Sequence, residues 1–155
     1  MTRRVGIAVV GVLVVLVAGF LLLARPATTA AAGPSAATGK CAVQASVVPG
    51  AAASRLPVQP LCALPKEAAQ VWAQIVAGGK LRYDRDGITF ANRERLLPSK
   101  ASGFYREYTV TTPGESDRGA RRLITGGDRG VDQQVYYTGD HYVSFVVVDV
   151  TATGR

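Results

Sequence analysis

Hydrophobic residues form two different patterns along the 155-residue chain. The first is a block of 20 uncharged residues, Val5 to Ala24, which follows Arg3 and Arg4. This is about the length that a membrane-spanning helix needs, whereas the small residues from Ala27 to Gly33 offer the cleavage sites of a signal peptide. We therefore predict a signal peptide or a membrane anchor over residues 1–32. The residues after the arginine pair match a twin-arginine signal poorly, but the pair itself predicts that the rest of the chain is exported.

The second pattern begins after residues 33–60, a segment rich in Ala, Gly, Pro, Ser and Thr that we interpret as a flexible linker. From Leu64 to Gly79 the apolar positions recur with helical spacing, and a pair of glycines ends the run. This predicts one helix with Pro65 at its first position. Its apolar face, which we expect to pack in the core, consists of Leu64, Ala68, Val71, Trp72 and Ile75.

Beyond the helix, apolar and polar residues alternate in short runs that turn-forming residues separate. The predicted strands are residues 88–90, 105–111, 121–125, 134–137 and 142–150. One helix followed by a meander of strands predicts an α+β domain over residues 61–150, with a tail at 151–155. We expect the helix to cover one face of a small twisted antiparallel sheet, and a site to lie on the other face.

The charge balance is basic, with 18 Lys and Arg residues against 11 Asp and Glu residues. Removal of residues 1–32 takes away three arginines and no acid, so the exported part keeps 15 basic residues and a net charge of +4. This fits a soluble basic surface or a polyanionic partner. Two cysteines, Cys41 and Cys62, suit an oxidising compartment. With one distant histidine they do not predict a metal site.

The strands also carry side chains suited to phosphodiester transfer. Glu107 lies inside a predicted strand, Arg118, Arg121 and Arg122 form a cluster, and His141 is the only histidine. Each is more often an ordinary surface residue. Together they supply a base, an acid and fixed positive charge, which is what the reaction needs without a metal.

Four segments, in this order, closely resemble those of the secreted bacterial guanyl-specific ribonucleases. They are DGITFANRERLLP, YREYTVTTPG, RGARRLITGG and YYTGDHY, within residues 61–149. The resemblance implies the microbial ribonuclease fold, with Glu107 as general base, His141 as general acid, and Arg118 and Arg122 as a phosphate clamp. It implies cleavage of single-stranded RNA after guanosine through a 2′,3′-cyclic phosphate, with no cofactor. The implied guanine site consists of Phe90, Asn92, Arg93, Glu94 and Tyr142.

Two features depart from that family. Its members join a cysteine near the domain start, which Cys62 matches, to one at the C-terminus, but here the C-terminus has none. We therefore predict a disulfide between Cys62 and Cys41, the only other cysteine. The segment GGDRGVDQQV before the last motif is also longer.

The resemblance also suggests a small acidic inhibitor protein as a partner beside single-stranded RNA. We expect a monomer that is secreted, or anchored to the outer face of the membrane if Val5–Ala24 is not cleaved. Two other classes of function stay open. A non-catalytic RNA-binding or polyanion-binding surface module would not need Glu107 and His141 together, and a tethered structural domain would leave the basic, aromatic sheet face unexplained.

Overall fold

The computed structural model describes residues 41–43, 48–128 and 133–152. These residues belong to one compact unit, Ser35–Arg155. The predicted signal peptide or anchor lies outside them, as do residues 129–132 of the segment that precedes the last motif. Within the described ranges, no helix is both long and apolar enough to cross a membrane.

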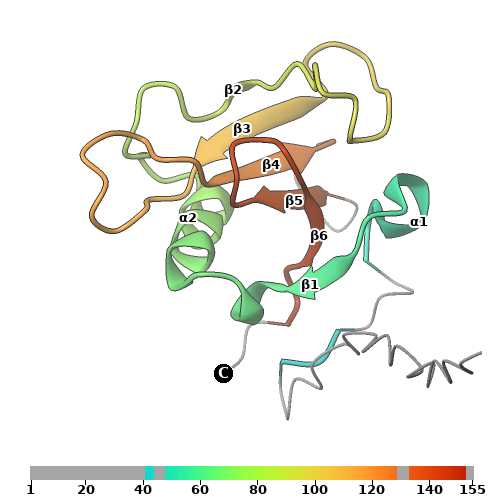
Figure 1. Cartoon of the computed structure of the whole chain (residues 1–155), viewed down its shortest axis with the longest axis horizontal. Helices are drawn as coiled ribbons and strands as arrows, with labels where there is room; N and C mark the ends of the chain where they lie inside the picture. The colour runs from blue at the N-terminus through green and yellow to red at the C-terminus, as the bar shows by residue number, and fades with distance from the viewer. Residues whose placement is uncertain (1–40, 44–47, 129–132, 153–155) are drawn as a thin grey trace, which may run out of the picture. The chain divides into compact units, whose positions relative to one another are not determined.

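Six strands form one sheet in the order β1-β6-β5-β4-β3-β2 (Figure 1). Neighbouring strands from β2 to β6 are antiparallel, whereas β1 pairs with β6 in parallel. The predicted α+β class is therefore confirmed, with a mixed sheet in place of a purely antiparallel one. The strands are β1 Val58–Pro60, β2 Ile88–Thr89, β3 Tyr105–Thr109, β4 Arg122–Gly126, β5 Gln134–Thr138 and β6 Val146–Asp149.

The folded part of the chain begins earlier than residue 61. A short helix, α1 (Ala51–Ser54), and strand β1 both lie inside the segment interpreted as a linker. Val58 pairs with Val147 in the sheet, and the backbone N–H of Val147 donates to the carbonyl of Pro57 over 2.8 Å. The predicted linker boundary at residue 60 therefore does not match the structure, because these backbone hydrogen bonds hold the segment to β6 in spite of its loop-like composition.

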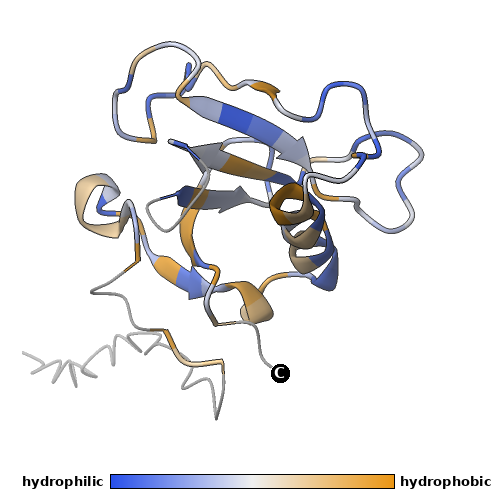
Figure 2. Ribbon diagram, turned by 180° about the vertical axis from the view of Figure 1, so that it is seen from behind, coloured by the Kyte–Doolittle hydropathy of each residue, from blue (hydrophilic) through white to orange (hydrophobic). Residues whose placement is uncertain are grey.

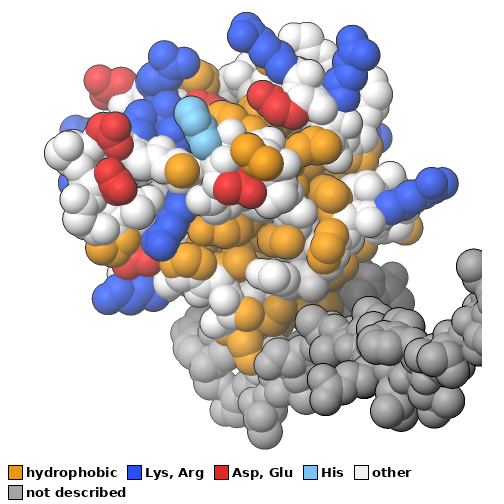
Figure 3. Space-filling view, viewed as in Figure 1, with side chains coloured by type: hydrophobic (Ala, Val, Ile, Leu, Met, Phe, Trp, Pro, Cys, Tyr) orange, Lys and Arg blue, Asp and Glu red, His pale blue; other side chains and the backbone are white. Residues whose placement is uncertain are grey.

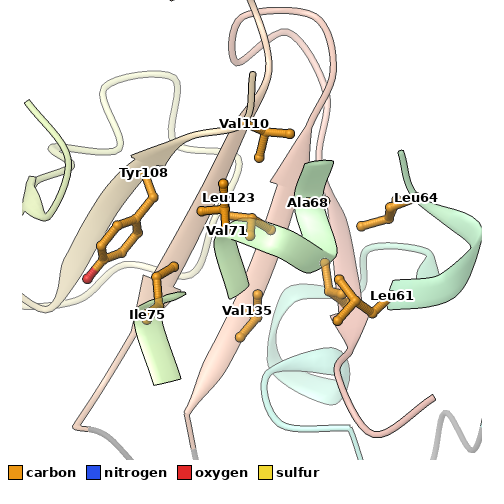
Figure 4. Close-up of a cluster of buried hydrophobic side chains, with 10 residues drawn as sticks. Leu61, Leu64, Ala68, Val71, Ile75, Tyr108, Val110, Leu123 and Val135 are labelled. Carbon is orange, nitrogen blue, oxygen red and sulfur yellow. The ribbon is translucent and has the colours of Figure 1, made fainter. Parts of the chain in front are cut away.

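Helix α2 (Lys66–Ala77) packs against one face of the sheet (Figures 1 and 4). Pro65 occupies the position just before its first turn, and Gly78, with φ 64°, ends it by donating its N–H toward the carbonyls of Gln74 and Ile75. This confirms the predicted helix, although it is shorter at each end. Its buried residues are Ala68, Val71 and Ile75, and the sheet residues that they meet include Tyr108, Val110, Leu123 and Val135.

The opposite face of the sheet is not bare. Strand residues Ile124, Tyr136 and Val147 carry a second cluster, which the loop residues Phe90 and Phe145 cover. In Figure 2 the middle of β3 is hydrophilic, whereas the middle of the adjacent β4 is hydrophobic. The second cluster lies on the face away from α2, and Glu107 of β3 is on that face because its register partner is Ile124.

The predicted disulfide joins Cys41 to Cys62, with 6.0 Å between their Cα atoms. Cys62 belongs to a 3-10 turn, η2 (Leu61–Ala63), just before α2. The C-terminal segment still reaches this turn, because the backbone N–H of Cys62 donates to the carbonyl of Ala152 over 3.2 Å. The bridge thus ties the start of the described chain to the point where η2, α2 and Ala152 meet.

Candidate active site

Glu107 is a buried carboxylate in the middle of β3, with 7% of its surface exposed. Its register partner on β4 is Ile124, which places it on the sheet face opposite α2. The hydroxyl of Tyr142 donates to Oε2 over 2.7 Å, and Nη2 of Arg118 lies 3.4 Å from Oε1. Both carboxylate oxygens are therefore held in place, which is the arrangement expected of a positioned proton acceptor.

Arg118 is fixed by contacts with three side chains. Its Nε donates to Oγ1 of Thr109 over 2.8 Å, and its Nη2 lies 3.4 Å from Glu107 and 3.7 Å from Oδ1 of Asp86. Asp86 also accepts the backbone N–H of Thr109 over 2.7 Å and is almost completely buried at its side chain. Sequence reasoning missed Asp86, because it stands in the turn DRDG, where an aspartate is an ordinary turn residue.

Arg122 begins β4 and is buried, with 4% of its surface exposed. Its Nη1 donates to the carbonyls of Arg118, Gly119 and Arg121 over 3.3, 2.8 and 2.8 Å. Its Nε is buried and has no hydrogen-bond partner among the residues that the structure describes. Because a buried donor without a partner is costly, this N–H is suited to an incoming anion. Arg121 differs, because its Nη1 lies 3.9 Å from Oε2 of Glu67 in α2. Its side chain therefore belongs to the sheet face that α2 covers.

His141 and Tyr142 lie on a turn, although Tyr142 was predicted to begin a strand. The predicted strand over 142–150 begins only at Val146, because His141 and Tyr142 have φ values of 58° and 72°. Left-handed conformations are uncommon for residues other than glycine, especially for a bulky residue such as Tyr142, and they often mark functional sites. The strand prediction was therefore wrong for residues 142–145. His141 itself is exposed, as the pale blue side chain in Figure 3 shows.

Polar contacts from Asp140 hold this turn in shape. Its carboxylate accepts the backbone N–H of Ser144 over 3.0 Å and the hydroxyl of Thr138 over 2.8 Å. The hydrogen bonds from Ser144 and Thr138 keep the pKa of Asp140 below its usual value. Thr138 in turn accepts the backbone N–H of Tyr142 over 3.1 Å. The turn thus brings the imidazole of His141 beside the ring of Tyr142, with 4.9 Å between the ring centroids.

Tyr142 connects the candidate base to the candidate guanine site. Its hydroxyl contacts Glu107, its ring centroid lies 5.3 Å from that of Phe90, and the guanidinium of Arg122 lies 6.0 Å from the ring centroid. Burial, and then the hydrogen bond to Glu107, raises the pKa of Tyr142. The hydroxyl therefore stays protonated and remains a donor to the carboxylate.

The loop from Phe90 to Leu97 is shaped by Asn92. This residue has φ 47°, and its side-chain Nδ2 donates to the carbonyl of Leu97 over 2.8 Å while its Oδ1 accepts the backbone N–H of Leu97 over 3.1 Å. The side chain of Asn92 is thus used within the loop. Of the predicted base-site residues, Glu94 is left as an exposed carboxylate.

One hollow of about 250 Å³ joins this loop to Glu107, the candidate base. Arg118, Arg122 and His141 contact Glu107 or Tyr142, both of which line it. The nine predicted catalytic and base-site residues thus meet in one region. Among the described parts of the chain, no group of three or more His, Cys, Asp or Glu residues could hold a metal ion. The predicted residues that line the hollow are Phe90, Asn92, Arg93, Glu94, Glu107 and Tyr142.

Comparison with known proteins decides the family. The family model described as ribonuclease matches residues 47–149. The chain belongs to the ribonuclease family. Guanyl-specific ribonuclease Sa of Kitasatospora aureofaciens is 48% identical over 91 residues, which are 59% of this chain and 92% of that protein. Guanyl-specific ribonuclease St of Saccharopolyspora erythraea is 49% identical over 85 residues, which are 55% of this chain and 80% of that protein.

Solved structures of this ribonuclease family share the fold. Ribonuclease Sa2 in complexes with mononucleotides is 42% identical and has a TM-score of 0.57, over 61% of this chain and 94% of that chain. Ribonuclease Sa2 with guanosine-2′-cyclophosphate is also 42% identical and has a TM-score of 0.56, over 61% of this chain and 97% of that chain. The family and the ribonuclease fold predicted from the sequence are therefore confirmed.

Proposed function

We propose that this protein is an endoribonuclease that cleaves single-stranded RNA on the 3′ side of guanosine. The observation that carries the proposal is a buried carboxylate, Glu107, which opens into the same hollow as the loop that holds Glu94. The names of relatives that are 48% and 49% identical, both guanyl-specific ribonucleases, support the same activity. A non-catalytic binding module is disfavoured, because it would have no need of a positioned carboxylate and a histidine that both contact Tyr142.

In the first step, Glu107 takes the proton from the ribose 2′-hydroxyl, and the 2′-oxygen forms a bond to the adjacent phosphorus. The bond from phosphorus to the 5′-oxygen of the next nucleotide breaks as protonated His141 donates to that oxygen. The products are a 2′,3′-cyclic phosphate and a free 5′-hydroxyl. In the second step the roles reverse, and water opens the cycle to a 3′-phosphate.

Arg118 and Arg122 stabilise the charge that develops on the phosphate oxygens. Arg118 is held toward Glu107 by Thr109, and Arg122 offers a buried Nε without a partner in the described structure. Guanidinium groups suit this task because they bind phosphate through parallel hydrogen bonds. Because the nucleophile is the 2′-hydroxyl, DNA should not be cleaved.

Guanine recognition is assigned to the loop from Phe90 to Glu94. The Glu94 carboxylate would accept hydrogen bonds from the N1–H and the exocyclic amine of guanine, and the backbone N–H groups near Asn92 and Arg93 would bind O6. The rings of Phe90 and Tyr142, whose centroids are 5.3 Å apart, would enclose the base. This agrees with the way in which proteins read unstacked RNA bases on their edges.

The cellular setting is part of the proposal. The protein would act as a secreted monomer, or on the outer face of the membrane if Val5–Ala24 is not cleaved. A small acidic inhibitor protein is supported by the basic surface and by exposed hydrophobic residues beside the site. These are Ile88, Leu96 and Val143, with exposed fractions of 37%, 40% and 76%.

Cleavage mapping on a defined RNA tests the proposed function. The protein should cut single-stranded regions after guanosine, with equal rates in the presence and absence of a chelator, and should leave DNA of the same sequence intact. The matched control is Glu67→Gln, which removes a carboxylate from the α2 face and should not change the rate. Cuts without base preference, or an absence of cuts by folded protein, would refute the proposal.

A further inference from the structure

A second hollow backs onto the loop that we assign to guanine. It has a volume of about 420 Å³, and it shares Thr89, Phe90, Ala91 and Asn92 with the lining of the first hollow. One short segment of chain thus forms a wall between the two hollows. The rest of the second lining consists of Arg95, Leu97, Ser99, Lys100, Ala101, Ser102 and Tyr105.

The two hollows differ in their charged residues: both acids and bases line the first, including Arg85 and Arg93, whereas only bases line the second. Glu94 lines the first hollow, whereas the next residue, Arg95, has φ 55° and lines the second. Lys100 adds a second cation, Ser99 and Ser102 add hydroxyls, and no Asp or Glu is among the lining residues. The second hollow is therefore suited to an anion.

Both cations are free to bind such an anion. Within the described ranges, neither Arg95 nor Lys100 forms an ion pair. The Nζ of Lys100 lies over the ring of Phe104, 5.2 Å from its centroid, which limits the positions that this flexible side chain can take. The hydroxyl of Tyr105 donates to the carbonyl of Pro98 over 2.8 Å and holds the loop that presents Lys100.

We propose that the second hollow is a subsite for the nucleotide on the 5′ side of the recognised guanosine, and that Arg95 and Lys100 bind the phosphate between the two. This inference rests on the proposed function. The 3′-phosphate of the guanosine would lie at Glu107, which lines only the first hollow. The RNA on the 3′ side of the guanosine therefore runs toward His141. The RNA on the 5′ side then passes over residues 89–92 into the second hollow.

Comparison of the substrates GpC and UpGpC tests this subsite on the folded protein. UpGpC carries the extra 5′ phosphate, and the wild-type protein should cleave it with a kcat/KM roughly fivefold higher at low salt, as expected for contacts from two exposed cations. The gain should shrink between about 50 mM and about 200 mM NaCl, because phosphate contacts release counterions. A UpGpC analogue with a neutral methylphosphonate at the Up–G link should show no gain.

The variants Lys100→Gln and Arg95→Gln/Lys100→Gln should reduce this gain, the double variant to about onefold, while cleavage of GpC stays at the wild-type rate. Lys66→Gln, which removes the same charge from the exposed start of α2, should keep the full gain. Equal rates on GpC and UpGpC for the wild type, or a gain that persists in the double variant, would overturn the subsite. Failure to cleave GpC at all would instead refute the proposed function.

Discussion

The hydroxyl of Tyr142 offers a direct test of how the site holds its carboxylate. It donates to Oε2 of Glu107 over 2.7 Å, and burial together with this bond raises the pKa of Tyr142. Tyr142→Phe removes only this oxygen. The ring contacts with Phe90 and Phe145, at 5.3 and 6.4 Å between centroids, do not depend on the hydroxyl and should remain.

The expected loss follows from the surroundings of this bond. A hydrogen bond to a charged group contributes about 1.5–3 kcal/mol. Tyr142 is partly exposed, and Arg118 still contacts the other oxygen of Glu107 at 3.4 Å, so the lower end of this range applies. We expect the free energy of unfolding to fall by about 1.5 kcal/mol, and Tm by roughly 5–10 °C for a domain of this size.

The assay is a double-mutant cycle measured by urea unfolding at neutral pH. It compares the wild type, Tyr142→Phe, Glu107→Ala and the double variant, and the coupling should be about 1 kcal/mol or more. Tyr83→Phe is the matched control, because the hydroxyl of Tyr83 forms no hydrogen bond with the part of the chain that the structure describes. It should change stability by less than about 0.5 kcal/mol. In the same protein, kcat for GpC should fall about tenfold with little change in KM, since about 1.4 kcal/mol corresponds to a tenfold change in rate. A coupling of zero with unchanged kcat would refute the idea that Tyr142 positions Glu107.

Three further predictions follow from the structure. Replacement of Cys41 and Cys62 by alanine should lower the free energy of unfolding by about 3 kcal/mol in the chain-entropy model, because the bridge closes a segment that includes β1; unchanged urea midpoints would show that it contributes nothing. Stability should fall as the pH rises above about 10, the ordinary pKa of tyrosine, because burial raises the pKa of several tyrosines in the folded protein and their neutral forms stabilise it below that pH. The tyrosines with a raised pKa are Tyr105, Tyr136, Tyr137 and Tyr142. Ultraviolet titration of the tyrosines and urea unfolding at increasing pH check this prediction. Full stability well above the ordinary pKa of tyrosine would contradict it. Glu94→Ala should reduce cleavage of GpC far more than that of ApC, since sites that hydrogen-bond a substrate group discriminate strongly against analogues without it; an equal loss on both substrates would show that Glu94 does not read the base.

The sequence predicted those parts of the fold whose pattern is local. Helix α2 follows from the helical spacing of Ala68, Val71 and Ile75 and from the glycine at its end. Alternation along β3 placed Glu107 on the face opposite Tyr108, and the two residues do belong to opposite faces. The candidate site residues were chosen because their motifs resemble those of a known family. Spacing alone does not show that Glu94 and Glu107 share a hollow.

The features that the sequence did not reveal depend on contacts between distant segments. Strand β1 exists because Val58 pairs with Val147, and nothing in an Ala-rich and Pro-rich segment indicates that partner. The turn at His141 and Tyr142 depends on left-handed backbone angles. The alternation of apolar and polar residues does not reveal these angles, so it predicted a strand from residue 142. The contact of Asp86 with Arg118 joins a turn to a loop and has no local signal.

The central claim is that Glu107 and His141 act together as base and acid on RNA. The most direct measurement follows cleavage of GpC by phosphorus NMR in the presence of a chelator, with the wild type, Glu107→Gln, His141→Gln and the double variant. The wild type should form guanosine 2′,3′-cyclic phosphate before the 3′-phosphate, with a bell-shaped pH dependence because the base must be ionised and the acid protonated. Each single variant should be slower by about 10²–10⁴-fold while remaining folded. Cleavage by the folded double variant at the wild-type rate, or formation of the 3′-phosphate without the cyclic intermediate, would contradict the assignment.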